Sequence, residues 1–169
     1  MPSELDRVMA MDSLVRTLTD AAPRLAFYRV CSLVAPSAVR LFTATELFEV
    51  YTWGSMGVSN LLTRYPAERE DIPQVTRLVT EPTLKTTMMF KGFLVAPMSA
   101  RGQPLGFLRI KLGAATAADL AWASLLASTL SYASTVCRSH DEARGRRSSS
   151  LSLLQVPLAE TRESFLDTR

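Results

Sequence analysis

The side chains that most often carry out catalysis are scarce in this sequence and are poorly placed for it. His140 is the only histidine, and it follows a helical pattern beside Asp141 and Glu142, where a solvated surface residue is expected. The cysteines, Cys31 and Cys137, lie in separate helix-like segments without a metal-ligand spacing, so both are expected to be reduced and buried. The sequence also lacks a glycine-rich phosphate loop, a nucleophile elbow and a metal-ligand cluster. We therefore expect a protein that is not an enzyme and that uses no metal or other cofactor.

A second kind of chemistry, the binding of a small molecule, needs aromatic surface together with a few polar groups. Residues of this kind lie at the end of one predicted strand and around the irregular middle of the chain. If the middle region roofs a sheet, the predicted pocket between them is lined by Tyr51, Trp53, Ser55, Asn60, Arg64, Met88 and Lys91. The alternative is that Tyr51 and Trp53 are ordinary strand residues that pack against a helix.

The elements that would position these residues begin with two helices. Residues 3–22 open on a capping-box spacing, Ser3 to Asp6, and continue with apolar residues at helical intervals. A second apolar helix is predicted over residues 24–35, because Pro36 disfavours helical geometry in the residue before it. Residues 38–44 and 47–53 are rich in β-branched and aromatic side chains, which predicts two strands, expected to form a hairpin.

The second half of the chain is more regular than its middle. Residues 58–85 contain three prolines and no clean period, so short helices and loops are expected there. Residues 88–98 and 105–112 predict two strands joined by a turn at residues 99–104, the second strand with one buried and one solvent-facing side. A long helix is predicted from Thr116, which forms a second capping box with Asp119, to about Arg144, with Gly145 ending it.

The late hairpin is similar to one found in a known family. From Gly92 to Leu112 an apolar strand ending in proline is followed by a glycine-containing turn and a Leu-Gly-aliphatic strand, as in GAF domains. Thr116 and Asp119 resemble the start of the helix that follows this hairpin in the family. The resemblance covers residues 90–138, and more loosely 1–57. It implies an α+β fold of the GAF/PAS-like kind, in which an antiparallel sheet of about five or six strands carries the N- and C-terminal helices on one face.

The resemblance also narrows the function. No cysteine lies between Cys31 and Cys137, so the sequence departs from the GAF-like methionine sulfoxide reductases and from bilin-binding members. The Asn-Lys-Phe-Asp-Glu signature of cyclic-nucleotide-binding members is absent as well. A non-catalytic regulatory module that acts through protein association is the interpretation we favour, and a small-molecule sensor is the alternative.

Association would use the terminal helices, since the final helix is apolar over an arc too wide for one contact. The resemblance implies pairing by bundling of the first and last helices, as a homodimer or as a heterodimer with a related domain, and leaves room for a regulatory partner protein. The predicted interface residues are Val8, Val15, Leu18, Trp122, Leu125, Tyr132 and Val136. The alternative is that the N-terminal helix covers the extra face within one chain.

Composition excludes several other partners. With 47% hydrophobic residues in 169, the chain can bury one core, divided here into a helix at 1–22, a GAF-like domain at 23–144 and a tail at 145–169. A net charge of +3 without a basic patch argues against nucleic acid. We see neither a signal peptide nor a long uninterrupted apolar run, and expect a cytoplasmic protein without a membrane span.

The tail suggests a modification. Ser148, Ser149 and Ser150 follow Arg146 and Arg147 at the spacing that basophilic kinases favour. We predict a flexible tail with these serines as candidate phosphorylation sites, Ser149 the preferred acceptor. A plain solvated linker is the alternative.

Overall fold

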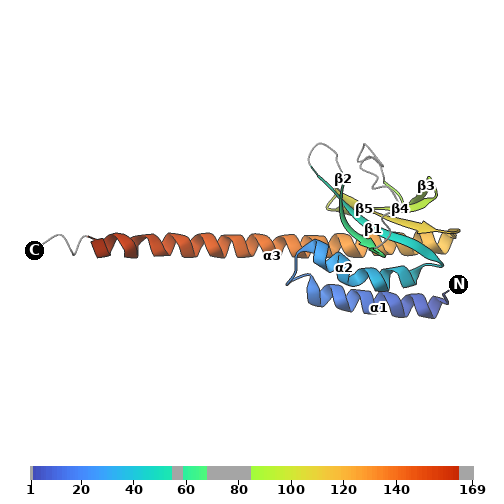
Figure 1. Cartoon of the computed structure of the whole chain (residues 1–169), viewed down its shortest axis with the longest axis horizontal. Coiled ribbons are helices and arrows are strands. Elements are labelled where there is room, and N and C mark those ends of the chain that lie inside the picture. The colour runs from blue at the N-terminus through green and yellow to red at the C-terminus, as the bar shows by residue number, and fades with distance from the viewer. Residues whose placement is uncertain (1, 55–58, 68–84, 164–169) are drawn as a thin grey trace, which may run out of the picture.

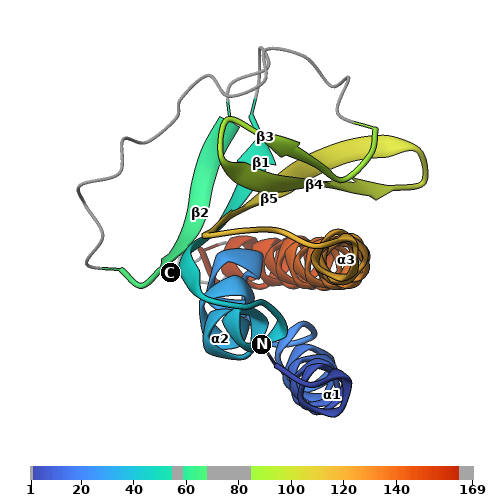
Figure 2. The same cartoon turned by 90° about the vertical axis from the view of Figure 1, so that its right-hand side faces the viewer.

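The helices that the structure describes lie on one face of an antiparallel sheet (Figure 2). The computed structural model describes residues 2–54, 59–67 and 85–163, with side chains described as far as residue 145. The helices are α1 (Glu4–Ala21), α2 (Phe27–Ala38) and α3 (Ala117–Glu163), with a short 3-10 helix, η1 (Val39–Leu41), after α2. The strands are β1 (Thr45–Trp53), β2 (Ser59–Tyr65), β3 (Met88–Phe90), β4 (Phe93–Ala100) and β5 (Gln103–Leu112). Their order in the sheet is β2-β1-β5-β4-β3 (Figures 1 and 2), so the predicted α+β fold class is confirmed.

Both capping boxes read from the sequence are present. At the start of α1, the backbone N–H of Asp6 donates to the Ser3 hydroxyl at 3.1 Å, and the Ser3 N–H donates to the Asp6 carboxylate at 2.9 Å. The start of α3 repeats the pattern, with Asp119 N–H to Thr116 Oγ1 at 3.2 Å and Thr116 N–H to Asp119 Oδ2 at 2.8 Å. These bonds satisfy N–H groups that have no partner within the helix, which fixes where each helix begins.

The late hairpin forms as predicted, with tighter turns. β4 and β5 are adjacent and antiparallel, with Leu94 opposite Ile110. They are joined by Arg101 and Gly102, both at positive φ, the geometry of a two-residue hairpin turn. The single strand expected over residues 88–98 is wrong. Lys91 and Gly92 also have positive φ and form a turn that divides this segment into β3 and β4.

The predicted hairpin over residues 38–53 is the main error in the first half. Val34, Ala38 and Leu41 are fully buried at intervals of four and three residues, which is a helical period. α2 therefore passes through Pro36 and is followed by η1, and residues 38–44 are not a strand. The hairpin partner of β1 is β2, which lies in the region expected to hold only helices and loops.

The sheet is covered on both faces in its centre. On the helix side, Phe48, Leu108 and Ile110 pack under the helices in the main core. On the opposite side, Tyr51, Val95 and Phe107 form a second, smaller cluster. One side of the strand at residues 105–112, carrying Phe107, Arg109 and Lys111, was expected to face solvent. This is wrong for Phe107 and Arg109, which are both completely buried.

The final helix is much longer than the domain needs. Leu126, Leu130 and Ala133 are buried where α3 crosses the sheet. Beyond it the helix continues through Gly145 to Glu163 and projects away from the domain (Figure 1), so the predicted end at Gly145 is wrong. One glycine inside a helix costs only about 1 kcal/mol relative to alanine, too little by itself to stop it. The 47 helical residues span about 70 Å. The division of the chain at residues 22 and 144 stays a prediction.

Candidate functional site

The helices α1 and α3 lie side by side and leave an apolar groove between them. Arg7 of α1 and Asp119 of α3 form an ion pair of 2.9 Å near the starts of both helices. Further along, the groove has a volume of about 260 Å³. It is lined by Val15, Leu18, Thr19, Ala22, Pro23, Thr129, Tyr132, Ala133 and Val136.

The seven predicted interface residues fall into two groups by exposure, and four of them line this groove: Val15, Leu18, Tyr132 and Val136. Val8, Val15, Leu125 and Tyr132 are exposed, Tyr132 by 74% of its surface. Leu18 is buried in the core, and Trp122 and Val136 are half-buried against it. The predicted alternative, that α1 covers the extra face of α3 within one chain, therefore describes part of the surface and leaves four side chains in contact with solvent.

A buried polar cluster occupies the opposite face of the sheet. Glu49 of β1 lies across from Arg64 on β2 and from Arg109 on β5, so the three residues form a row over three strands. The Glu49 carboxylate accepts a hydrogen bond from Arg109 Nε on Oε2 at 2.5 Å and one from Arg64 Nε on Oε1 at 2.8 Å. The Tyr51 hydroxyl donates to Oε2 at 3.2 Å. A single buried carboxylate is thus shared by two guanidinium groups and a phenol.

Aromatic rings surround the cluster. The rings of Tyr51 and Phe107 stack with their centroids 4.8 Å apart, and Trp53 lies 5.3 Å from Phe107. Burial, and then the nearby charge of Glu49, raises the pKa of Tyr51 to about 12. The phenol is therefore neutral at physiological pH and acts as a hydrogen-bond donor.

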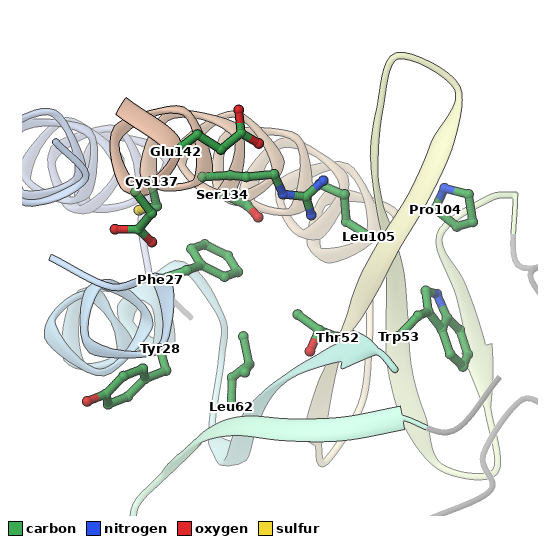
Figure 3. Close-up of a pocket in the computed structure, with 12 residues that line it drawn as sticks. Phe27, Tyr28, Thr52, Trp53, Leu62, Pro104, Leu105, Ser134, Cys137 and Glu142 are labelled. Carbon is green, nitrogen blue, oxygen red and sulfur yellow. The ribbon is translucent and has the colours of Figure 1, made fainter. Parts of the chain in front are cut away.

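A third feature is an open pocket where α3 leaves the sheet. It has a volume of about 490 Å³ and lies between α2, α3 and the ends of β1, β2 and β5 (Figure 3). Phe27 and Leu105 are among its apolar walls, and Asp141 and Glu142 line it from α3. Trp53, one of the predicted ligand residues, also lines it.

The comparisons with known proteins decide the fold. No protein-family model matches the sequence, and no curated protein matches it. Among solved structures, the GAF domain of an Acinetobacter phosphoenolpyruvate-protein phosphotransferase is similar over 82% of this chain and 96% of its own, with a TM-score of 0.60 and 11% identity. The GAF domain of a putative sensor histidine kinase from Pseudomonas syringae pv. tomato is similar over 83% of this chain and 92% of its own, with a TM-score of 0.59 and 16% identity.

The fold is that of a GAF domain. The matches cover 96% and 92% of the two neighbours, and 82% and 83% of this chain. The likeness confirms the interpretation drawn from the late hairpin and the helix after it. At these identities it establishes the GAF-like fold and no binding property.

The predicted ligand residues of this GAF-like fold are only partly brought together. Tyr51, Trp53 and Arg64 lie in or beside the polar and aromatic clusters, and Tyr51 and Trp53 pack on Phe107 rather than against a helix. Asn60, Met88 and Lys91 are exposed, on β2, on β3 and in the turn after β3. Ser55 lies outside the described residues.

Two residues of the cluster, Glu49 and Arg109, were missed by the sequence reasoning. Each is a single charge between apolar neighbours, Phe48 and Val50 in one strand and Leu108 and Ile110 in the other. Opposite charges inside two apolar strands are the signal that was available. It becomes informative only when the two strands are known to be neighbours.

The part of the chain that the structure describes offers no activated nucleophile. Cys31 and Cys137 are free and buried, and burial raises the pKa of both thiols, so they stay protonated. Within these residues there is no group of three or more side chains that could hold a metal ion.

One segment of α3, Ala117–Gly145, is long and apolar enough by composition to cross a membrane. Its residues Ala123, Leu126 and Leu130 are completely buried in the domain core. In all, 39% of the most apolar stretch of this segment is buried inside the domain, so the segment is in part a core helix.

Proposed function

We propose that this GAF-like domain is a non-catalytic regulatory module that pairs with a second copy of itself through the exposed apolar face of α1 and α3. The observation that carries the proposal is a set of four apolar side chains of α1 and α3 that remain exposed after α1 has packed in place: Val8, Val15, Leu125 and Tyr132. Val15 and Tyr132 also line the groove. We call these four residues the helical face.

The helical face has the composition of an association surface. Full burial of a valine or leucine side chain is worth about 1.5–3 kcal/mol, and tyrosine is frequent among the residues that dominate interface energies. In a symmetric dimer each of these contributions counts twice, because the same patch is used on both subunits. The groove of about 260 Å³ next to Tyr132 offers a place for an apolar side chain of the second copy.

The projecting part of α3 suggests what such pairing would achieve. α3 contributes Leu125 and Tyr132 to the helical face and then continues as one helix to Glu163. Pairing at the domain would hold two such helices near each other, and a change in pairing would be passed along them. Free, buried cysteines also fit a reducing compartment, so we propose that the module works as a soluble protein in the cytoplasm.

The mass of the full chain in solution tests this proposal. We expect a dimer at micromolar concentration, and a monomer for Leu125→Glu and for Tyr132→Glu, because each places a charge in the interface. The matched control is Leu33→Glu on α2, since Leu33 is exposed by 53% and Leu125 by 48%. Circular dichroism should show the same helix content in all four proteins.

The results that would overturn the proposal are distinct. A wild-type monomer at micromolar concentration removes self-association altogether. If Leu33→Glu dissociates the dimer and Leu125→Glu does not, the interface lies on another face. If the chain forms a mixed dimer with a related GAF domain and no homodimer, the helical face is an interface for that domain and self-association is wrong.

A second function, sensing of a small molecule, is favoured by the buried cluster around Glu49. Buried charged groups are rarely kept in a core for stability alone. This observation is independent of the helical face, which lies on the other side of the sheet.

A further inference from the structure

We infer that the open pocket where α3 leaves the sheet is a binding site for an apolar α-amino acid, held by Arg138 and Asp141. The pocket has a volume of about 490 Å³, within the range of about 300–1,000 Å³ that is typical of small-molecule sites. It lies on the helix side of the sheet, because Leu62 and Leu105 in its wall also pack against the main core. The site is distinct from the cluster around Glu49 and does not depend on the pairing proposed above.

The inner wall of the pocket is apolar. It is formed by Phe27 of α2, Leu62 of β2 and Leu105 of β5, and all three side chains are half-buried. Figure 3 shows the Phe27 ring directed towards the sheet and the Leu62 side chain directed towards the helices, with the pocket between them. An apolar group that enters this space gains about 25 cal/mol for each Å² that it removes from water, and a planar ring also packs well against the ring of Phe27. The wall therefore favours a ligand with an apolar side chain.

Two oppositely charged side chains of α3 line the same pocket. Arg138 and Asp141 are both exposed, and neither side chain forms an ion pair or a hydrogen bond with any residue that the structure describes. They are three residues apart on the helix with the cation on the N-terminal side, the order in which such helical pairs are weaker. Both charges are therefore available to a ligand.

The other polar groups of the pocket leave these two charges in place. Glu142 also lines the pocket, but it has a further interaction of its own, and Figure 3 shows its carboxylate on the side of α3 away from Phe27. Ser134, one turn before Arg138, is only 9% exposed, and within the described part of the chain its hydroxyl has no hydrogen-bond partner. A nearly buried hydroxyl without a partner favours a ligand that brings polar groups of its own.

An α-amino acid matches this arrangement. It carries its ammonium and its carboxylate on one carbon, and the Cβ atoms of residues three apart on a helix lie only about 5–6 Å from each other. The guanidinium of Arg138 can donate two parallel hydrogen bonds to the carboxylate, while Asp141 accepts from the ammonium. An amine or an acid alone would leave one of these two side chains without a partner. The apolar side chain of the ligand then lies against Phe27 and Leu62.

Calorimetric titration of the full chain with L-phenylalanine tests the inference. Two analogues of similar shape are the comparison probes: phenethylamine, which lacks the carboxylate, and hydrocinnamate, which lacks the ammonium. We expect saturable binding of phenylalanine at millimolar concentration. Each analogue should bind at least about tenfold more weakly, because it loses one charged hydrogen-bonding partner.

Two substitutions separate the two halves of the site. Arg138→Gln should weaken phenylalanine binding at least about tenfold and leave the weak binding of phenethylamine unchanged, since phenethylamine has no carboxylate for Arg138 to hold. Asp141→Asn should weaken phenylalanine binding as strongly and leave that of hydrocinnamate unchanged. The matched control is Arg144→Gln, which removes the same charge from an exposed position of α3 outside the pocket and should bind phenylalanine as the wild type does.

Several results would overturn the inference. They are the absence of phenylalanine binding at tens of millimolar, equal binding by Arg138→Gln or Asp141→Asn, a loss in Arg144→Gln as large as that in Arg138→Gln, and binding of either analogue as strong as that of phenylalanine. Circular dichroism checks that each variant is folded, and the analogues test the site in the wild type without any substitution. The mass of each sample separates a failure of this site from a failure of dimerisation.

Discussion

Arg7 and Asp119, 112 residues apart in the sequence, form a buried ion pair at the start of the two helices that carry the helical face. The Asp119 carboxylate accepts two hydrogen bonds there. Its Oδ1 accepts one from Arg7 Nη2 at 2.9 Å, and its Oδ2 accepts one from the backbone N–H of Thr116 at 2.8 Å. The Asp119 carboxylate thus caps the N-terminus of α3 and also forms the ion pair that links α3 to α1. This contact joins the starts of α1 and α3, the two helices that line the apolar groove.

Replacing Asp119 should therefore be severe. Asp119→Ala removes the cap of α3 and leaves the Arg7 guanidinium buried without its partner, which should lower the free energy of unfolding by about 3–5 kcal/mol. Urea denaturation followed by circular dichroism measures the change. The matched control is Asp12→Ala, which breaks the exposed pair with Arg16 and should cost no more than about 0.5 kcal/mol. Similar losses in the two variants would show that the buried pair does not fix the helices.

Gly106 should tolerate no side chain. A Cβ on Gly106 would lie 1.9 Å from the carbonyl oxygen of Tyr51 and 2.8 Å from the Cα of Thr52, both backbone atoms of β1. Gly106→Ala should therefore separate β1 from β5 and destabilise the fold by about 4 kcal/mol or more, measured as a lowered melting temperature or loss of soluble protein. The control is Gly113→Ala, where a Cβ would meet nothing within 4 Å and the effect should be small. A normal melting temperature for Gly106→Ala would contradict the close contact of the two strands.

Tyr51 should make the protein sensitive to alkali. Its pKa is raised from 10.0 to about 12 in the folded protein, so the folded state keeps this proton where the unfolded state has lost it. The stabilisation is complete below pH 10 and is lost as the pH rises towards 12, by about 1–3 kcal/mol. Denaturation at a series of alkaline pH values should show this loss in the wild type and a smaller one in Tyr51→Phe. The control is Tyr28→Phe, because Tyr28 is exposed, and this variant should lose as much stability at alkaline pH as the wild type. If Tyr28→Phe shows the smaller loss instead, the alkaline sensitivity does not come from Tyr51.

Ser149 is the predicted acceptor in the C-terminal segment, with Ser148 and Ser150 as neighbours. The backbone there is part of α3, so the helix must open locally before a kinase can engage it, and we expect partial phosphorylation. A phosphate adds about −1.5 to −2 charges beside Arg146 and Arg147, which would pair with it. Mass spectrometry of protein from its native cell should find phosphate on Ser149. Its absence from all three serines under every growth condition would leave the segment as a spacer only.

Features that depend on residues close together in the chain could be predicted before the structure was known. Both capping boxes need only residues three apart, so Ser3 with Asp6 and Thr116 with Asp119 could be read directly. The β4–β5 hairpin carries its own turn, and α3 is marked by a long apolar helical period. These local signals were enough for the α+β class and for the resemblance to GAF domains.

Features that depend on residues far apart in the chain could not be predicted, because they follow from packing between elements. Residues 38–44 contain β-branched and aromatic side chains that favour a strand, yet residues 38–41 are helical, with Ala38 and Leu41 fully buried in the core. β2 has no strong strand pattern and exists because β1 offers it an edge. Glu49 and Arg109, 60 residues apart, become a pair only when β1 and β5 are neighbours, since neither charge could be buried alone.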